Sequence, residues 1–237
     1  MEKDVGVGSI IGETLNLLGQ NMRAVLLFVV VISVVSIAGL AMGLVDANDS
    51  IASLGYDFRV TTDEGLLAAL YQLAAAAVTI VAAYFLLAEM LKGRGRLGSA
   101  EPRIWAYIGM SILALLGYVI GFLLLVVPGV ILMVRWAASS GFLIGAREDV
   151  VGSLSASWDA TRGHSWAIFF AGVVLFIGLV IVAGVIGGIT AVTGVDLLVA
   201  SISAVLESFA NALFLAFGIG VYLLVHNDST QTAEVFS

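Results

Sequence analysis

The sequence predicts an all-α integral membrane protein of about six transmembrane helices, with two further amphipathic helices at the membrane surface. Of its 237 residues, 61% are hydrophobic and 11% are charged, which is less than half of the roughly 25% usual in a soluble domain. Long apolar stretches follow one another along the chain, and basic residues fall in alternate connecting segments. We therefore expect one polytopic membrane domain over residues 1–237.

Six apolar stretches are each close to the ~20 residues that an α-helix needs to cross a bilayer core. Inside lipid the backbone must satisfy its own hydrogen bonds, so these stretches predict helices rather than open strands. Together they predict a six-helix bundle over residues 24–226, with spans at 25–45, 66–90, 104–127, 129–146, 167–189 and 204–225.

The basic residues predict the orientation of these helices, because Lys and Arg in short loops are held on the cytoplasmic side. They occur before the first stretch and in the second and fourth connections, at Lys3, Arg23, Lys92, Arg94, Arg96, Arg103, Arg147 and Arg162. The opposite side holds only Arg59. Both termini are therefore predicted to lie in the cytoplasm.

Two segments are too polar to span and have the pattern of amphipathic helices at the inner surface. The first lies within residues 1–23, and the second covers 150–162. In the second, apolar residues recur at helical spacing with serines elsewhere on the helix, and Gly163 is placed to end it. Trp158, Arg162 and Trp166 are predicted to be interfacial residues, the tryptophans as part of the aromatic belt.

Three other segments lie outside the main apolar stretches. Residues 46–64 are rich in acids and turn formers, which predicts a solvated loop outside the cytoplasm. Residues 190–203 are semi-polar, and they predict either a surface segment or an extension of the sixth helix. Residues 227–237 predict a polar, disordered cytoplasmic tail.

The region 104–146 is about twice as long as one crossing requires. Pro128 and Gly129 lie near its middle, and a Pro-Gly pair favours a tight turn. We therefore predict a hairpin at Pro128 and Gly129 on the outer surface, which makes the third and fourth helices antiparallel. A kink within one tilted helix is the alternative.

Two GxxxG patterns permit close approach of helices. Gly117 and Gly121 form one in the third stretch, and Gly184 and Gly188 form another in the fifth. Within one chain such patterns favour internal packing over dimerisation, so both are predicted to face neighbouring helices.

One block of the sequence resembles a broad group of bacterial six-helix membrane proteins. The block runs from Pro128-Gly129 through Arg135-Trp136 to the stretch SLSASWDATRG at 153–163 and on to Trp166. The group includes the YciC-like, UPF0259-type proteins and the membrane domain fused to some glycerophosphoryl diester phosphodiesterases. The resemblance implies a location in the bacterial inner membrane. It implies little mechanism, because the phosphodiesterase chemistry belongs to a separate soluble barrel that this sequence lacks.

The chain departs from that group at two positions. Members often have a proline in the fourth helix where this chain has Gly141, and a basic residue before the Ser-Trp pair where it has Ala156. The second departure weakens any expectation of phosphate contact at that loop.

Arg135 and Glu207 are the charges predicted to lie deepest in the membrane. Charged groups in hydrocarbon usually face the bundle interior and pair, so we predict an Arg135–Glu207 ion pair. It is either a packing contact between two helices or part of a polar cavity, unless Arg135 reaches the surface instead. Asn211 lies one turn after Glu207, and Gln72 is a further intramembrane polar candidate, expected to form interhelical hydrogen bonds.

Several classes of function lack their sequence signals. The chain has no cysteine, and neither of its two histidines has a metal-like partner one helical turn away, so no metal site or cofactor is predicted. No basic footprint for nucleic acid and no nucleophile elbow is present. We therefore predict a non-catalytic membrane protein whose partners are lipids and other membrane proteins. The alternative is a small transporter or lipid-handling protein with a polar site around Arg135 and Glu207.

Overall fold

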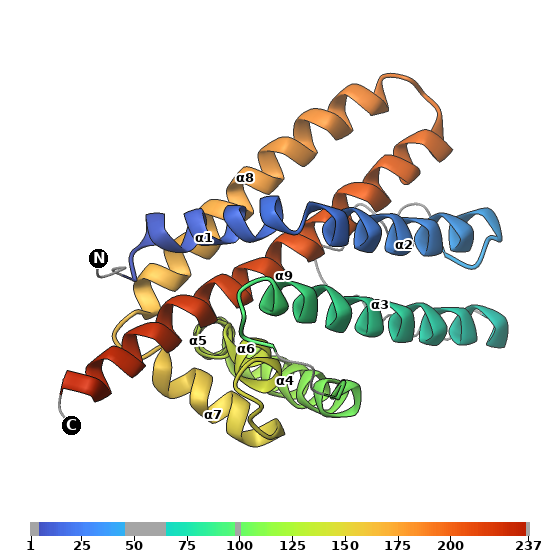
Figure 1. Cartoon of the computed structure of the whole chain (residues 1–237). Coiled ribbons are helices and arrows are strands. Elements are labelled where there is room, and N and C mark those ends of the chain that lie inside the picture. The colour runs from blue at the N-terminus through green and yellow to red at the C-terminus, as the bar shows by residue number, and fades with distance from the viewer. Residues whose placement is uncertain (1–4, 46–64, 98–100, 236–237) are drawn as a thin grey trace. The chain divides into compact units, whose positions relative to one another are not determined.

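A computed structural model describes residues 5–45, 65–97 and 101–235 of the chain, in which the secondary structure is entirely helical (Figure 1). The helices of this part are α1 (Val7–Gln20), α2 (Met22–Ala41), α3 (Leu66–Lys92), α4 (Ile104–Leu124), α5 (Val126–Arg135), α6 (Ser139–Ile144), α7 (Val150–Ala160), α8 (Ser165–Ala191) and α9 (Asp196–Val235). The predicted all-α class is confirmed. The predicted loop 46–64 lies outside the described residues.

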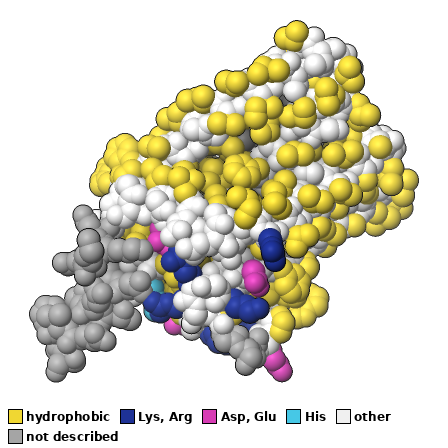
Figure 2. Space-filling model, turned by 45° about the horizontal axis from the view of Figure 1, so that its top comes forward, with side chains coloured by type: hydrophobic (Ala, Val, Ile, Leu, Met, Phe, Trp, Pro, Cys, Tyr) yellow, Lys and Arg dark blue, Asp and Glu magenta, His cyan; other side chains and the backbone are white. Residues whose placement is uncertain are grey.

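Six helical segments of the described chain are long and apolar enough to cross a membrane. They are Met22–Ala41, Leu66–Lys92, Ile104–Leu124, Val126–Ile144, Ser165–Ala191 and Leu197–His226. Figure 2 shows hydrophobic side chains over most of the visible helical surface, with charged side chains gathered in one part of it. Such broad exposure of large apolar side chains suits lipid and not water. The chain is therefore a multi-pass membrane protein.

The chain divides into two compact units, which are described separately. The first contains Met1–Asn21, Leu87–Leu175 and Leu215–Ser237, and the second contains Met22–Leu86 and Phe176–Phe214. The first unit thus holds α1 and α4 to α7 with one end each of α3, α8 and α9. It also holds the candidate site.

In the first unit, α4 and α5 form an antiparallel pair, as predicted, but the chain reverses at a different residue. Leu125 is the extended residue between the two helices, with φ −168° and ψ 154°. Pro128 and Gly129 lie inside the first turns of α5. The predicted hairpin position at Pro128 and Gly129 is therefore wrong. A proline suits the first turn of a helix as well as it suits a turn, because the N–H that it lacks would have no partner there.

Glycines of the first GxxxG pattern let the two helices of this hairpin approach closely. A Cβ at Gly117 would lie 2.3 Å from the Trp136 ring, and one at Gly121 would lie 3.0 Å from the Gly129 Cα. Internal packing of this pair is confirmed. In contrast, no described atom lies within 4 Å of the Cβ position at Gly184 or Gly188. Internal packing is thus not seen for the second pattern in the part of the chain that the structure describes.

The C-terminal part of α9 packs against α1 and α6 in the first unit. Tyr222 lies over Gly141, where a Cβ would come within 2.2 Å of its ring, and the Phe142 ring meets Tyr222 edge-on at 5.0 Å. Thr14 of α1 lies 3.1 Å from the Cβ position of Gly220. Ile10 and Leu17 of α1 are fully buried by protein, whereas Leu15 is 55% exposed. The prediction that α1 lies along the inner membrane surface stays a prediction.

In the second unit, α2 contacts both α3 and α9 through polar side chains. The Tyr71 hydroxyl donates a hydrogen bond to the Val35 carbonyl. The Ser33 hydroxyl donates to Ser208 at 3.2 Å, and Ser208 donates in turn to the Ala204 carbonyl at 2.7 Å. Hydrogen bonds of this kind commonly hold membrane helices together.

The last helix resolves two sequence predictions. Because α9 begins at Asp196, most of residues 190–203 extends the sixth predicted helix and forms no separate surface segment. The same helix continues to Val235, so the backbone of 227–235 is helical where a disordered tail was predicted.

Candidate functional site

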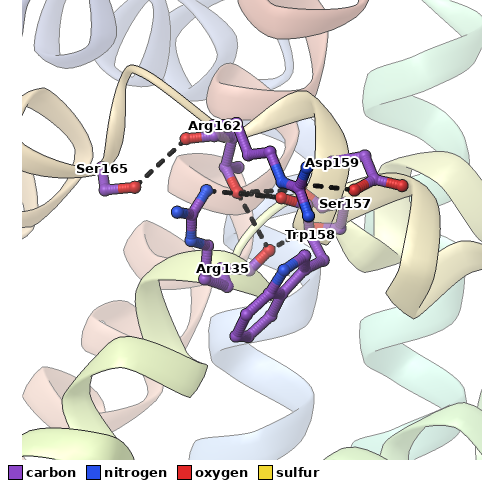
Figure 3. Close-up of polar contacts among 7 residues, drawn as sticks. Arg135, Ser157, Trp158, Asp159, Arg162 and Ser165 are labelled. Carbon is purple, nitrogen blue, oxygen red and sulfur yellow. Dashed lines mark hydrogen bonds and ion pairs between the residues drawn. The ribbon is translucent and has the colours of Figure 1, made fainter.

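The candidate site is built where α7 packs against the break between α5 and α6 (Figure 3). We define the Arg135 cluster as Arg135, Ser157, Trp158 and Thr161. The helix α7 begins at a side-chain cap, in which Asp149 accepts a hydrogen bond from the Gly152 N–H at 2.9 Å. Gly163 follows its end with φ +84°, a conformation that favours glycine, as the sequence predicted.

The buried residues of α7 are Ser153, Leu154 and Ser157. Ser153, Ser157 and Thr161 are fully buried, whereas Val151 is exposed. The sequence predicted a helix with serines away from its apolar face, and the structure shows that Ser153 and Ser157 pack on protein, whereas Ser155 is exposed. Small hydroxyl residues allow this close approach and supply hydrogen bonds between helices.

Ser157 joins the two ends of the helix break. Its hydroxyl donates to the Arg135 carbonyl at 2.7 Å and accepts from the Ala138 N–H at 3.2 Å. These backbone groups belong to the end of α5 and the start of α6, where helices leave carbonyls and N–H groups without partners. Ser157 therefore stabilises a break that helix propensity alone would not favour.

Thr161, one helical turn after Ser157, contacts the same helix break. Its hydroxyl lies 2.8 Å from the Ser157 carbonyl and 3.4 Å from the Arg135 carbonyl. Sequence reasoning missed the role of Ser157 and Thr161. The signal was a helix with three hydroxyl residues at 153, 157 and 161, which is an i, i+4 spacing on one face.

Arg135, the last residue of α5, is held by Trp158. Its guanidinium carbon lies 5.3 Å from the centre of the indole, within the range of a cation–π contact. Its Nη1 lies 3.4 Å from the Trp158 carbonyl oxygen, a long hydrogen bond. Both contacts lower the cost of placing this charge away from water.

The corner between α7 and α8 carries the other predicted interfacial residues. Arg162 lies 3.5 Å from Asp159, and both side chains are largely exposed. Ser165 donates to the Thr161 carbonyl at 3.2 Å, and the exposed Trp166 stacks on Phe170. The residue types and exposure suit an interfacial position, which stays a prediction.

Two further arginines of the first unit are fixed by contacts that sequence reasoning missed. Arg103 donates from Nη1 to the Glu148 carbonyl at 2.8 Å and lies 3.4 Å from the Leu143 carbonyl, near the end of α6. Arg94 lies 2.5 Å from the Glu13 carboxylate, whose side chain is 5% exposed. Glu13 shares the buried face of α1 with Ile10 and Leu17, and an acid at such a position is the signal for a buried partner.

The other predicted polar residues lie in the second unit. Gln72 is half-buried in α3, and Glu207 and Asn211 are half-buried one turn apart on α9. Ser208, beside Glu207, makes the contact to Ser33. Arg135 belongs to the first unit, so the predicted Arg135–Glu207 pair stays a prediction.

The described residues hold no group of three or more histidines and carboxylates that could bind a metal ion. His226 belongs to an aromatic cluster, where it stacks on Tyr222 at 5.2 Å. The Arg135 cluster therefore binds backbone groups of the helix break through hydroxyl groups and holds the Arg135 guanidinium against Trp158. We find no converging acid and base in it.

Comparison with protein-family models, with curated proteins and with solved structures finds no match to this chain. The resemblance to the YciC-like group is thus a prediction from residues 128–166. What the chain itself establishes is an all-α, multi-pass membrane protein with a hydrogen-bonded helix break at the Arg135 cluster.

Proposed function

We propose that this chain is a non-catalytic protein of the bacterial cytoplasmic membrane, with both termini in the cytoplasm. It acts by packing against membrane lipids and other membrane proteins. The bacterial setting rests on the resemblance of residues 128–166, and the orientation rests on the basic residues of alternate loops.

One observation supports the non-catalytic role. The polar groups of the Arg135 cluster make their hydrogen bonds and ring contacts to backbone and ring atoms of the same unit. Ser157 holds both sides of the helix break, and Arg135 lies against Trp158. A catalytic site requires groups that converge on a position for a substrate, with an acid, a base or a nucleophile among them. Groups that are occupied in this way favour a structural role.

The alternative is a small transporter or lipid-handling protein. In that case Glu207, Asn211 and Gln72 would line a path together with Arg135. Polar side chains one turn apart on α9 are what such a path requires, and the same side chains equally serve to hold helices together.

Thermal unfolding of the purified protein separates these roles. Anything that binds the native state raises Tm in a saturable way. A packing role predicts that added phospholipid raises Tm, whereas a panel of soluble ions, sugars and amino acids leaves it unchanged.

The matched variants are Asn211→Ala in the second unit and Ser155→Ala at an exposed position of α7. A soluble solute that raises the Tm of the wild type and of Ser155→Ala, but not of Asn211→Ala, would support the transporter and contradict our proposal.

A further inference from the structure

Arg147 has a backbone conformation that residues with a side chain rarely adopt. It lies between α6 and α7 with φ +60°, in the left-handed region that favours glycine. A strained backbone position that keeps a long side chain points to a function for that side chain. The other described positions with such a φ are all glycines, namely Gly43, Gly95, Gly163 and Gly194.

The backbone turn at Arg147 does not itself require arginine. It reverses the chain after α6, so that the Glu148 N–H donates to the Phe142 carbonyl at 3.1 Å and satisfies a carbonyl of the helix end. Glycine would allow the same bond without strain. The Arg147 side chain is exposed, and no hydrogen bond or ion pair joins it to the part of the chain that the structure describes. Its charge can therefore bind a group outside the protein.

The ends of two candidate membrane spans meet beside Arg147. One span begins at Ile104, and the other ends at Ile144, three residues before Arg147. Arg103 joins these two ends, because its Nη1 donates to the Glu148 carbonyl at 2.8 Å. Antiparallel spans that end side by side place this corner at a boundary of the membrane.

Exposed apolar side chains lie at the same corner. Trp105, at the start of α4, is 86% exposed, and Val151, at the start of α7, is 63% exposed. Trp105 lies one turn before Gly109, whose Cβ position is 3.6 Å from Val150, so it shares the face of α4 against which α7 begins. Tryptophan is common at the level of lipid headgroups. A cation beside exposed apolar groups matches a lipid, whose phosphate lies next to its acyl chains.

The carboxylates of this corner limit the kind of contact that an anion can make. Asp149 accepts from the Gly152 N–H at 2.9 Å, and the Glu148 carboxylate lies 3.2 Å from the Cβ position of the same glycine. Both lie at the N-terminus of α7, which favours negative charge. Glu101, before α4, is exposed. Because acids are interspersed with the arginines here, an anion has to be bound by direct contact with the Arg147 guanidinium and not by long-range attraction.

From these observations we propose that Arg147 binds the phosphate group of a phospholipid in the leaflet at this corner, with Trp105 beside the lipid. A guanidinium can donate two parallel hydrogen bonds to phosphate oxygens, which gives a specific contact at an exposed site. The site explains why arginine is kept where glycine is favoured. The inference rests on the membrane setting of the proposed function but not on the non-catalytic role.

Thermal unfolding in a phosphate-free detergent tests the ligand class. The purified chain is titrated with dioleoylphosphatidylglycerol, with dioleoylglycerol, which lacks the phosphate, and with inorganic phosphate, which lacks the acyl chains. We expect a saturable rise in Tm with phosphatidylglycerol and with neither of the other two. An equal rise with dioleoylglycerol would show that the phosphate is not recognised. A rise with inorganic phosphate would assign a soluble ligand instead, and either result would overturn the proposal.

Arg147→Gly tests the residue, because glycine suits the backbone at this position. Its Tm without lipid should equal or exceed that of the wild type, since the strain is removed. The half-saturating concentration of phosphatidylglycerol should increase about fivefold, the effect of one basic residue at a lipid surface. Trp105→Ala should also increase it. The matched control is Lys92→Gln, which removes one exposed positive charge from the same unit and should leave it unchanged.

Two results with Arg147→Gly would overturn the proposal. A lower Tm without lipid would show that the protein itself holds the side chain, and an unchanged response to phosphatidylglycerol would show that the guanidinium does not bind the lipid. Either result would leave the proposed packing role standing. Failure of the wild type to respond to any phospholipid would contradict that role as well, so the two proposals fail in distinguishable ways.

Discussion

At the scale of single residues, polar side chains in this protein are placed where a backbone group or a charge has no other partner. Ser157 satisfies both sides of the break between α5 and α6. Glu13 and Arg94 neutralise one another on a largely buried face. The sequence identifies Arg135 and Glu207, because a charge inside an apolar stretch is conspicuous. It does not find Ser157, because serine is ordinary on a helix and its partner is set by tertiary packing.

Ser157→Ala should lower the free energy of unfolding by about 1–3 kcal/mol, because the Ala138 N–H loses its acceptor and the Arg135 carbonyl keeps only the 3.4 Å contact to Thr161. Ser153→Ala is the matched control. Ser153 is equally buried on α7, but its hydroxyl bonds to Val150 of the same helix. Unfolding of both variants in detergent measures the difference, and equal losses would show that the bridge across the break contributes nothing.

Glu13→Leu should cost about 3–5 kcal/mol, because it leaves the Arg94 guanidinium largely buried without its partner. The double change Glu13→Leu with Arg94→Met should recover much of that loss. Glu89→Leu removes one partner of the exposed Glu89–Lys92 pair and serves as the control, with an expected cost of at most about 1 kcal/mol. If the double variant is as unstable as the sum of the single ones, the two side chains do not form a pair.

At the scale of elements, the apolar runs predicted the positions of the helices. They did not predict the turn between α4 and α5 or the break between α5 and α6. The runs 104–127 and 129–146 are continuous in hydrophobicity, so the sequence offers Pro128 and Gly129 as the visible place to turn. The chain turns at Leu125 instead, since proline is equally suited to the first turn of α5. The break after Arg135 has no breaker residue at all. Ala137 and Ala138 favour helix, and the break depends on Ser157, a residue that is distant in sequence.

The two GxxxG patterns predict opposite outcomes for the same substitution. Gly121→Ala places a methyl group 3.0 Å from the Gly129 backbone and should destabilise the protein by about 1–3 kcal/mol. Gly184→Ala meets no described atom within 4 Å, and alanine favours a helix more than glycine does by about 1 kcal/mol. We therefore expect Gly184→Ala to be neutral or stabilising in thermal unfolding. A loss at Gly184 that equals the loss at Gly121 would mean that the second pattern is also packed.

At the scale of the whole molecule, composition and the apolar stretches predicted the all-α class and six apolar helices, and the described residues confirm both. The orientation that the alternating charge predicts stays a prediction. The candidate site was predicted less completely. Arg135 was identified, but its contacts to Trp158 come from the packing of α7, which no local pattern specifies. Arg135 and Glu207 belong to different compact units, so only a measurement can test their predicted pairing.

A double-mutant cycle on Arg135→Met and Glu207→Leu tests that pairing. If the two side chains meet, the double variant should recover about 0.5–3 kcal/mol relative to the sum of the single losses. Additive losses of unfolding free energy would show that the two charges do not interact. Arg135 would then be stabilised by its contacts with Trp158.

The central claim is that this chain crosses a membrane several times with its basic loops in the cytoplasm, and cysteine accessibility in intact cells tests it most directly. Thr193 lies in the exposed turn between α8 and α9, and Glu101 lies in the exposed segment before α4. We predict that an impermeant maleimide labels Thr193→Cys in intact cells and labels Glu101→Cys only after the membrane is permeabilised. Labelling of both positions in intact cells, or of neither, would contradict the predicted topology.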